Sequence, residues 1–407
     1  MMRAAATDST RLLRFFQDKR VLRHFSYIIK EASIWCLPEI WIPYGDTETL
    51  VTLGAENLGE LIEPAQDSLA EEEIERLKGS LAEFSDLVIC DCKPSTLEVV
   101  KRLLAEGPAQ GSKRILAADP RRVEARLPEL RGQVRGGGEK VSLPYDKGID
   151  LKVPAQLEED KSRLVLSTGG PDPLLGLLDS KVALPLAFVT NTRRLAYESR
   201  TSDDPTPFSE TSSAEALKGV AERFRNSSFV TVIPRSSRPH RLLRDASFDE
   251  VKNSFVALSA PRARAAIIGI GGEGYDDTFS DALRLVWSCI GCVKEAGEVL
   301  LVCECGEGLG SDALEMLITG RMTDQGPTKK KGVYVEGLEE LHYLRKLKGS
   351  YSIILMSGLP ELYARTKLGF ATARGSAEAV GKLLGKLGRT AKVNVVTRAC
   401  ECSLSSD

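Results

Sequence analysis

The chain has 407 residues, 42% of them hydrophobic, and its 55 basic residues nearly balance its 57 acidic residues. This length suggests two or three domains, and the balanced charge argues against nucleic acid as the main partner. No segment approaches the ~18 apolar residues that a membrane helix needs, and charged residues interrupt the apolar residues near the N-terminus, unlike an export signal. The sequence therefore predicts a cytoplasmic protein that binds neither nucleic acid nor a membrane.

Residues 1–37 are predicted to be a helical extension that precedes the first domain. Between residues 11 and 31, basic residues such as Arg11, Lys19 and Arg23 are interspersed with apolar residues. A basic amphipathic helix of this kind can lie on a membrane surface. More often such a helix packs its apolar face on its own domain, and we favour that interpretation.

Residues 38–259 are predicted to form a first α/β domain that opens with a hairpin over residues 40–45 and 49–53. Short apolar segments typical of buried strands then alternate with longer amphipathic segments. The strands are expected at residues 86–90, 115–118, 163–167 and 229–233, and the helices at 66–84, 96–105, 123–130, 214–224 and 248–258. This alternation indicates a mainly parallel sheet with helices on its faces.

Residues 260–407 are predicted to form a second α/β domain of the same kind. Its strands are expected at residues 265–270, 298–303, 351–356 and 392–397, and its helices at 278–292 and 376–387. Ligands of such sheets bind outside the carboxyl ends of the strands. We therefore expect a ligand cleft between the two domains.

A glycine-rich turn follows the strand predicted at residues 298–303. Gly306, Gly308 and Gly310 permit positive φ and a close approach of a ligand to the backbone, and Ser311 is a good N-cap for the helix that follows. The unpaired amide N–H groups at the start of a helix favour an anion. The turn is therefore a candidate ligand site, although a plain connection between strand and helix would show the same pattern.

Six of the nine cysteines fall in Cys-x-Cys pairs. Residues i and i+2 of a strand point to the same face, so Cys303 and Cys305 would converge with Cys400 and Cys402 if they lay on neighbouring strands. Four thiolates suit zinc or an iron–sulfur cluster. The alternative is that these cysteines are small residues of the core.

Several motifs occur together that are typical of one family. They are GGEGYD at residues 271–276, GEVLLV at 297–302, GEGLGS at 306–311 and AKVNVV at 391–396. The opening segment IPYG at residues 42–45 fits the same family. On these motifs, residues 38–400 resemble the nickel-pincer lactate racemase family.

The resemblance implies a nickel ion in a nucleotide-derived pincer cofactor, and hydride transfer to and from a 2-hydroxy acid. By position, Lys181 corresponds to the lysine that carries the cofactor covalently. The turn that helps to hold the cofactor phosphate corresponds to Asp91, Lys93 and Pro94, with Lys93 in place of an arginine. Arg284 corresponds to a lysine that faces the substrate.

Two of these residues also have an ordinary structural interpretation. Lys181 could be a solvated residue at the start of a buried strand, and Arg284 could form a surface ion pair with Asp281, three residues earlier on a helix. In the functional interpretation, Arg284 clamps a carboxylate or phosphate with two parallel N–H groups. Lys93, Lys181 and the turn 306–311 would then border one cleft, because each follows a strand.

Histidine is absent from the positions where the family uses it. The three histidines are His24, His240 and His342. The family's general bases fall near Arg121, Arg122 and Pro171, and its nickel ligand near Tyr197 or Glu198. Arginine does not deprotonate in proteins, and a carboxylate suits nickel less well than an imidazole. We therefore expect no lactate racemisation by the family's own route.

The sequence supports three functional hypotheses. The first is a divergent 2-hydroxy acid racemase or epimerase, an isomerase that uses the nickel-pincer nucleotide with altered acid and base residues. The second is a non-catalytic relative that binds a nucleotide or the cofactor. The third is a thiolate metal protein that shares the fold but has no such cofactor. In the first two, the partner is a small acidic or phosphorylated ligand.

Overall fold

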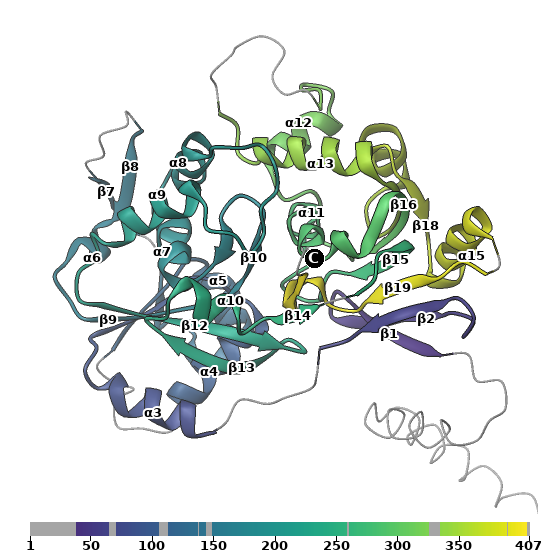
Figure 1. Cartoon of the computed structure of the whole chain (residues 1–407). Helices are drawn as coiled ribbons and strands as arrows, with labels where there is room; N and C mark the ends of the chain where they lie inside the picture. The colour runs from purple at the N-terminus through teal and green to yellow at the C-terminus, as the bar shows by residue number, and fades with distance from the viewer. Residues whose placement is uncertain are drawn as a thin grey trace, which may run out of the picture.

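The computed structural model describes residues 38–64, 71–105, 113–136, 138–143, 149–258, 260–324, 334–388 and 390–404 (Figure 1). The predicted N-terminal extension lies outside these residues. Two six-stranded sheets dominate the fold, and we call them the N-terminal sheet and the C-terminal sheet. Both are mainly parallel and flanked by helices, which confirms the predicted α/β class. None of the helices described is long and apolar enough to cross a membrane.

The N-terminal sheet has the strand order β13-β12-β9-β4-β5-β6, and only the β12–β13 pair is antiparallel. Its strands are β4 (Asp86–Ile89), β5 (Arg114–Ala117), β6 (Val134–Arg135), β9 (Arg163–Thr168), β12 (Ser227–Arg235) and β13 (Arg238–Arg244). Every residue of β4 and β9 is buried. This burial on both faces explains why the sequence shows continuous apolar runs there rather than alternation.

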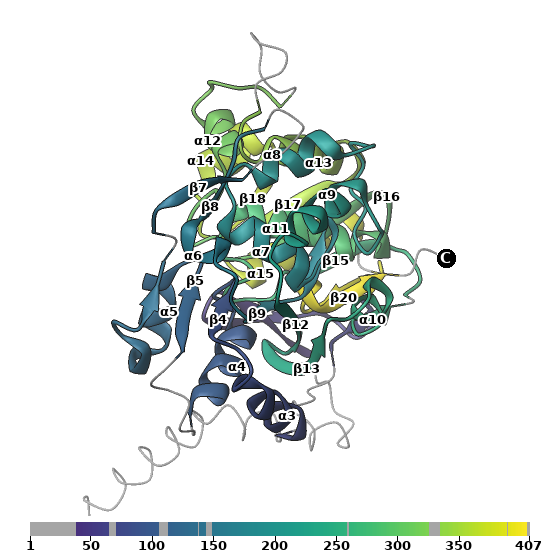
Figure 2. The ribbon, with the colours of Figure 1, turned by 90° about the vertical axis from the view of Figure 1, so that its left-hand side faces the viewer.

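Helices cover both faces of the N-terminal sheet (Figure 2). One face packs against α3 (Glu71–Leu81), α4 (Pro94–Leu104) and α5 (Pro120–Arg126). The other face packs against α7 (Ser180–Phe188), α8 (Thr192–Ser199) and α9 (Ser212–Ala221). The remaining elements of this half are α6 (Ala155–Glu158), α10 (Phe248–Lys252) and the hairpins β7 (Lys140–Leu143) with β8 (Leu151–Pro154) and β10 (Gly170–Asp172) with β11 (Gly176–Leu178).

The C-terminal sheet is parallel throughout, with the order β18-β17-β16-β15-β19-β3. Its strands are β3 (Leu58–Ile62), β15 (Ala263–Gly269), β16 (Val293–Val302), β17 (Ser352–Met356), β18 (Ala371–Ala373) and β19 (Val393–Val396). One face is covered by α11 (Phe279–Leu285), α12 (Asp312–Ile318) and α13 (Leu338–Ser350). The other face is covered by α15 (Ser376–Leu387) and by the hairpin of β1 (Glu39–Tyr44) and β2 (Thr47–Thr52).

The predicted opening hairpin is confirmed, but it packs with the C-terminal sheet rather than the N-terminal sheet. Ile40, Ile42 and Val51 join the apolar cluster on the face of the C-terminal sheet, and β3 pairs with β19. The predicted domain boundary at residue 260 stays a prediction. Strand β3 nevertheless pairs into the sheet that the end of the chain builds, and the hairpin of β1 and β2 packs on that sheet through apolar side chains.

Two predicted helices are shorter than expected. The helix predicted at 248–258 ends at Lys252, because residues 256–258 form a strand, β14, that pairs in parallel with β20 (Cys402–Leu404). The helix predicted at 278–292 ends at Leu285 and continues as two single 3-10 turns. In the first case, pairing with a distant strand overrides the local preference. The β14–β20 pair also joins the two halves of the molecule.

Candidate functional site

At the carboxyl ends of β4 and β9, the turn predicted to hold a phosphate lies against the last residue of β9, Thr168. Asp91 accepts hydrogen bonds from the backbone N–H of Lys93 at 3.0 Å and of Thr168 at 2.6 Å. The Thr168 hydroxyl lies 2.7 Å from the hydroxyls of Ser95 and Thr96, in the first turn of α4. Burial raises the pKa of Asp91, while Lys93 and the two backbone N–H groups oppose that rise. Asp91 therefore fixes the turn rather than presenting a free carboxylate.

The C-terminal half of the chain covers the start of α4. The Lys93 ammonium lies 4.7 Å from the centre of the Tyr275 ring, an arrangement in which the ring face attracts a cation. A Cβ on Gly274 would lie only 3.0 Å from Cδ of Pro94, so these two backbones are in close contact. Tyr275 is 1% exposed. Lys93 and Pro94 therefore lie at the junction between the halves, and a ligand cleft at this junction stays a prediction.

Lys181 is the second residue of helix α7, and the alternative of a buried strand at this position is wrong. Asp179 caps the helix by accepting a hydrogen bond from the N–H of Val182 at 2.9 Å. The Ser180 hydroxyl lies 2.6 Å from the hydroxyl of Thr231 on β12. These contacts anchor the first turn of α7, and Lys181 with it, on the N-terminal sheet.

Lys181 and Lys93 lie at the same edge of the N-terminal sheet. Thr231, which anchors α7, is paired with Ser167, and Ser167 directly precedes the Thr168 that anchors α4. Lys181 is half-buried, and among the described residues its ammonium has no hydrogen-bond or ion-pair partner. The charged group that interacts with it is the carboxylate of Asp179, two residues earlier. Because no ion pair holds the ammonium in place, it can still reach a ligand.

Two arginines of the N-terminal half pair with carboxylates of the C-terminal half. Arg122 Nη2 lies 2.7 Å from Oδ2 of Asp277 and also contacts Glu307. Arg126 pairs with Glu273. Arg122 occupies a position where the family resemblance expects a general base, yet it is a permanently charged group held by two carboxylates. These ion pairs connect the two halves and leave no base at that position.

Arg284 pairs with a buried carboxylate that the sequence analysis did not identify. Its Nη2 contacts Oε1 of Glu340 on α13, whereas Asp281 is 3.9 Å away. Glu340 is fully buried and accepts hydrogen bonds of 2.5 Å from the hydroxyls of Ser280 and Ser311. The Ser311 side chain therefore binds Glu340 and does not cap α12. A guanidinium neutralised in this way has little remaining charge for an external anion.

A second arginine links the halves beside Arg284. Arg193 Nε on α8 lies 2.6 Å from Oε1 of Glu339, and its Nη1 lies 3.2 Å from Oδ2 of Asp172. Burial alone would raise the pKa of Asp172, but Arg193, Arg284 and two backbone N–H groups bring it below its ordinary value. The Asp172 carboxylate therefore stays charged beside the two arginines.

The glycine-rich turn adopts the positive φ that its sequence predicts. Gly308 and Gly310 have φ of 91° and 82°, and Cys305, just before the turn, has φ of 54°. The backbone N–H groups of Phe279 and Ser280 donate to the carbonyls of Gly308 and Leu309. The turn is thus attached to the start of α11. Its role in ligand binding stays a prediction.

We expect alanine to be less damaging at Gly308 than at Gly310. Both positions carry the cost of left-handed backbone, about 1–2 kcal/mol for a residue with a Cβ. A Cβ at Gly310 would also lie 2.4 Å from Oγ1 of Thr278, whereas nothing lies within 4 Å at Gly308. Overpacking of this kind adds about 1–3 kcal/mol. Urea denaturation of Gly308→Ala and Gly310→Ala measures the difference, and equal losses would contradict the contact with Thr278.

A buried aspartate joins the opening hairpin to the carboxyl edge of the C-terminal sheet. Oδ2 of Asp276 accepts hydrogen bonds from the backbone N–H of Gly45 at 3.2 Å and of Glu304 at 3.0 Å. Its Oδ1 is buried without a hydrogen-bond partner. Burial raises the pKa of Asp276 to about 6, with a smaller contribution from Asp277 and Glu304.

The position expected for a nickel ligand lacks a suitable donor set. Glu198 forms an ion pair of 2.7 Å with Arg194 on the exposed side of α8, and the guanidinium of Arg200 lies 3.5 Å from the centre of the Tyr197 ring. Throughout the described part of the chain, no three histidine, cysteine, aspartate or glutamate side chains are arranged to hold a metal ion. Tyr197 and Glu198 therefore do not fit the role of nickel ligand that the resemblance assigns to this position, and the imidazole nearest to it is that of His342.

The cysteine pairs are buried and do not meet in one site. The sulfurs of Cys303 and Cys305 are 3.5 Å apart, while the sulfur of Cys400 lies against Gly271 and that of Cys402 is 3.1 Å from the Arg398 carbonyl. All four are buried. No three metal-ligating side chains of the described residues are arranged to hold an ion, so the structure gives no support to a centre with these four thiolates, and burial in the core explains them.

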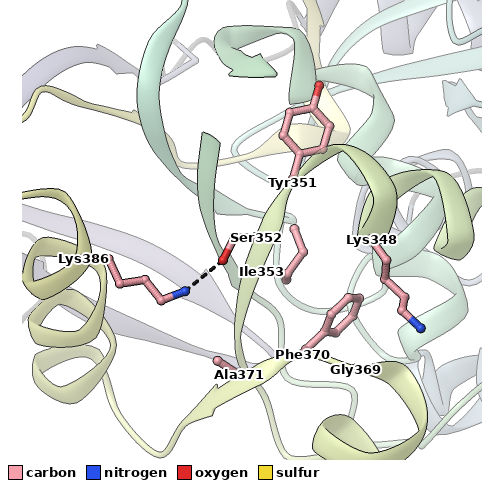
Figure 3. Close-up of a pocket in the computed structure, with 8 residues that line it drawn as sticks. All are labelled: Lys348, Tyr351, Ser352, Ile353, Gly369, Phe370, Ala371 and Lys386. Atoms are coloured by element: carbon pink, nitrogen blue, oxygen red, sulfur yellow. Dashed lines mark hydrogen bonds between the residues drawn. The ribbon is translucent and has the colours of Figure 1, made fainter. Parts of the chain in front are cut away.

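A hollow of about 270 Å³ opens on the C-terminal half (Figure 3). It lies at the amino end of β17, whereas the candidate ligand-binding residues Lys93 and Lys181 lie at the carboxyl ends of the strands of the N-terminal sheet. Lys386 Nζ donates to the Ser352 hydroxyl at 2.8 Å across it and is also paired with Glu298. Its lining residues are Lys348, Tyr351, Ser352, Ile353, Gly369, Phe370, Ala371 and Lys386.

These features define a class of protein with two parallel α/β units joined along an ion-paired junction. The fold is similar to that of the lactate racemase apoprotein from Thermoanaerobacterium thermosaccharolyticum, with a TM-score of 0.68 and 14% identity, covering 91% of this chain and 100% of that chain. A structure of a Thermotoga maritima protein is also similar, with a TM-score of 0.59 and 14% identity, covering 83% and 99% of the two chains. The chain therefore has a lactate-racemase-like fold. No protein-family profile and no curated protein matches the sequence.

The sequence analysis missed the residues of α13 and their partners. Glu339, Glu340 and His342 lie on this helix, and each contacts a residue at the junction. The adjacent Glu339 and Glu340 read as ordinary first-turn acids of a helix. Their fully buried state was not visible in the sequence, although a Gly before a Leu-Glu-Glu-Leu run was a usable signal for a helix start.

Proposed function

We propose that this chain is a divergent lactate-racemase-like protein that binds a small acidic or phosphorylated ligand at the junction, with Lys181 as its main cationic contact. One observation carries the proposal: Lys181 is half-buried, and among the described residues its ammonium forms no hydrogen bond or ion pair, although its charge interacts with the nearby Asp179 carboxylate. The arginines nearest the junction, by contrast, are neutralised by the chain's own carboxylates. An unpaired ammonium is the cation best able to attract an anion.

The contacts of Tyr197 and Glu198 argue against nickel chemistry of the lactate racemase family's kind. The expected metal position offers Tyr197, which is packed against Arg200, and Glu198, which is paired with Arg194. A lysine that carries a nucleotide would still be compatible with these contacts, because the covalent attachment needs only the amine. Binding without nickel is therefore our leading function.

A second function is favoured by one further contact. His342 brings an imidazole to the junction, where it lies 3.4 Å from the hydroxyl of Tyr197. Acid–base chemistry on a 2-hydroxy acid needs groups that exchange protons near neutral pH, and histidine is the common choice. Isomerisation with altered acid and base residues is therefore the second candidate.

The test is ligand binding by the purified chain and by Lys181→Ala. The probes are D-lactate, L-lactate, inorganic phosphate and nicotinic acid mononucleotide, measured by calorimetry. We expect at least one probe to bind and its affinity to fall at least about tenfold in Lys181→Ala, since a charge-assisted hydrogen bond contributes roughly 1.5–3 kcal/mol. Lys152→Ala is the matched control, because Lys152 is paired with Asp150 at 3.3 Å on the surface.

Intact mass and elemental analysis complete the test. Nickel together with an added mass on Lys181 would favour the racemase cofactor over our proposal. If none of the four probes binds, or if all bind Lys181→Ala as tightly as the parent chain, the proposed function is wrong.

A further inference from the structure

Tyr197 and His342 meet across the two halves of the molecule. Tyr197 lies on α8 and His342 on α13, and the Tyr197 hydroxyl is 3.4 Å from Nε2 of His342. The two rings are nearly parallel, with centres 6.4 Å apart and planes 10° apart. The contact therefore forms only when the two halves are together.

The hydrogen bond at Nδ1 of His342 determines which atom donates in the contact between Nε2 of His342 and the Tyr197 hydroxyl. Nη2 of Arg345 lies 2.9 Å from Nδ1 of His342. A guanidinium has donors but no acceptor, so Nδ1 must accept this hydrogen bond. The proton of a neutral ring is then on Nε2, which faces Tyr197. His342 donates to the phenolic oxygen, and the hydroxyl proton of Tyr197 must point elsewhere.

The charged groups around the pair keep both members neutral near pH 7. Burial and the cations Arg345 and Arg200 lower the pKa of His342, although Asp203 and Glu339 act in the opposite direction. Burial raises the pKa of Tyr197, while the Arg200 guanidinium, 3.5 Å from the ring centre, opposes that rise. A neutral phenol beside a cation is a good hydrogen-bond donor, because the cation stabilises charge that develops on its oxygen.

We propose that Tyr197 donates its hydroxyl proton in a hydrogen bond to an oxygen of the bound ligand, and that His342 is the positioning residue that directs it. This inference rests on the proposed function, since it concerns a ligand at the same junction. The ligand class is a small acid with an oxygen that gains negative charge, such as a 2-hydroxy or 2-oxo acid. No bond other than the hydrogen bond is formed or broken.

Two His342 variants separate donation from packing. His342→Gln keeps an N–H donor, whereas His342→Leu keeps only a side chain of moderate size. For the probe that binds most tightly among D-lactate, L-lactate, pyruvate and inorganic phosphate, we expect about a tenfold loss of affinity in Tyr197→Phe and in His342→Leu, the size of one ordinary hydrogen bond. His342→Gln should recover most of it. The double variant should lose little more than either single variant, because the two residues act as one unit.

Nitrogen-15 NMR of the imidazoles gives a readout that a merely structural contact would not change. The chain has three histidines, so His342 is assigned by comparison with His342→Gln. We expect its Nε2 to be protonated without ligand and its resonance to shift when the probe is added, with His240→Gln as the control. If a probe binds in a Lys181-dependent manner while His342→Leu binds it equally well, this inference is wrong and the proposed function stands. If neither these probes nor nicotinic acid mononucleotide binds the parent chain, both the inference and the proposed function are wrong.

Discussion

Replacing Arg284 with alanine should lower the free energy of unfolding by about 3–5 kcal/mol, the usual cost of breaking a buried ion pair. The reason is Glu340, which is fully buried and, within the described part of the chain, forms its ion pair with Arg284 alone. Ser280 and Ser311 would still donate to it, but two hydroxyls do not neutralise a carboxylate. Urea denaturation followed by circular dichroism measures the loss.

The matched control is Arg365→Ala. Arg365 is 65% exposed and paired with Glu361 at 3.0 Å on the surface, so we expect a change of about 0–1 kcal/mol. The double variant Arg284→Met with Glu340→Leu should recover most of the loss, because apolar residues of similar volume can replace a buried pair. If Arg284→Ala keeps the parent's stability and instead loses only ligand binding, Arg284 is a ligand clamp, as one sequence hypothesis had it.

Replacing Asp276 with asparagine should change how stability depends on pH. The folded state raises the pKa of this carboxyl to about 6 from an ordinary value of 3.8, mainly through burial. A raised carboxyl pKa means that its stabilising contribution is complete below pH ~4 and is lost as pH rises through ~6. Two pH units correspond to about 3 kcal/mol. Asparagine can still accept the N–H groups of Gly45 and Glu304 but does not titrate.

We therefore expect the stability of Asp276→Asn relative to the parent to improve by about 3 kcal/mol between pH 4 and pH 8. Denaturant unfolding at four pH values between these limits measures the change. Asp46→Asn, on the exposed tip of the same hairpin, should show no such trend. A constant difference between Asp276→Asn and the parent across this range would mean that the Asp276 carboxyl does not titrate there.

The fold class was predictable because burial leaves a direct trace in the sequence. Strands β4, β9, β15 and β17 are covered on both faces, so they read as short apolar runs. Helix α15 was predicted with its observed ends because it has one apolar face and Gly388 directly after it. Short exposed elements such as β6, β7 and β18 have no comparable pattern, and they were missed.

Strand partners were much less predictable than strands. Nothing local in residues 58–62 indicates that β3 pairs with β19, which lies more than 330 residues later. Residues 256–258 likewise become a strand only because β20 lies beside them. Both segments obtain their backbone partners from distant parts of the chain, and a pattern search along the sequence has no access to those contacts.

The candidate site shows the same division between local pattern and tertiary contact. From sequence alone came the strand end that precedes Lys93, the left-handed glycines at 308 and 310, and the absence of histidine from the expected base positions. The position of Lys181 at the start of a helix did not. Tertiary structure decided which cations remain available to a ligand. Glu340 neutralises Arg284, and Glu339 and Asp172 neutralise Arg193. The ammonium of Lys181, by contrast, forms no hydrogen bond or ion pair among the described residues. Backbone preferences act over a few neighbouring residues, so they can be read in order along the chain. Neutralisation of a charge depends on which side chain lies within about 4 Å of it in the folded molecule, and only packing of α8 and α11 against α13 determines that.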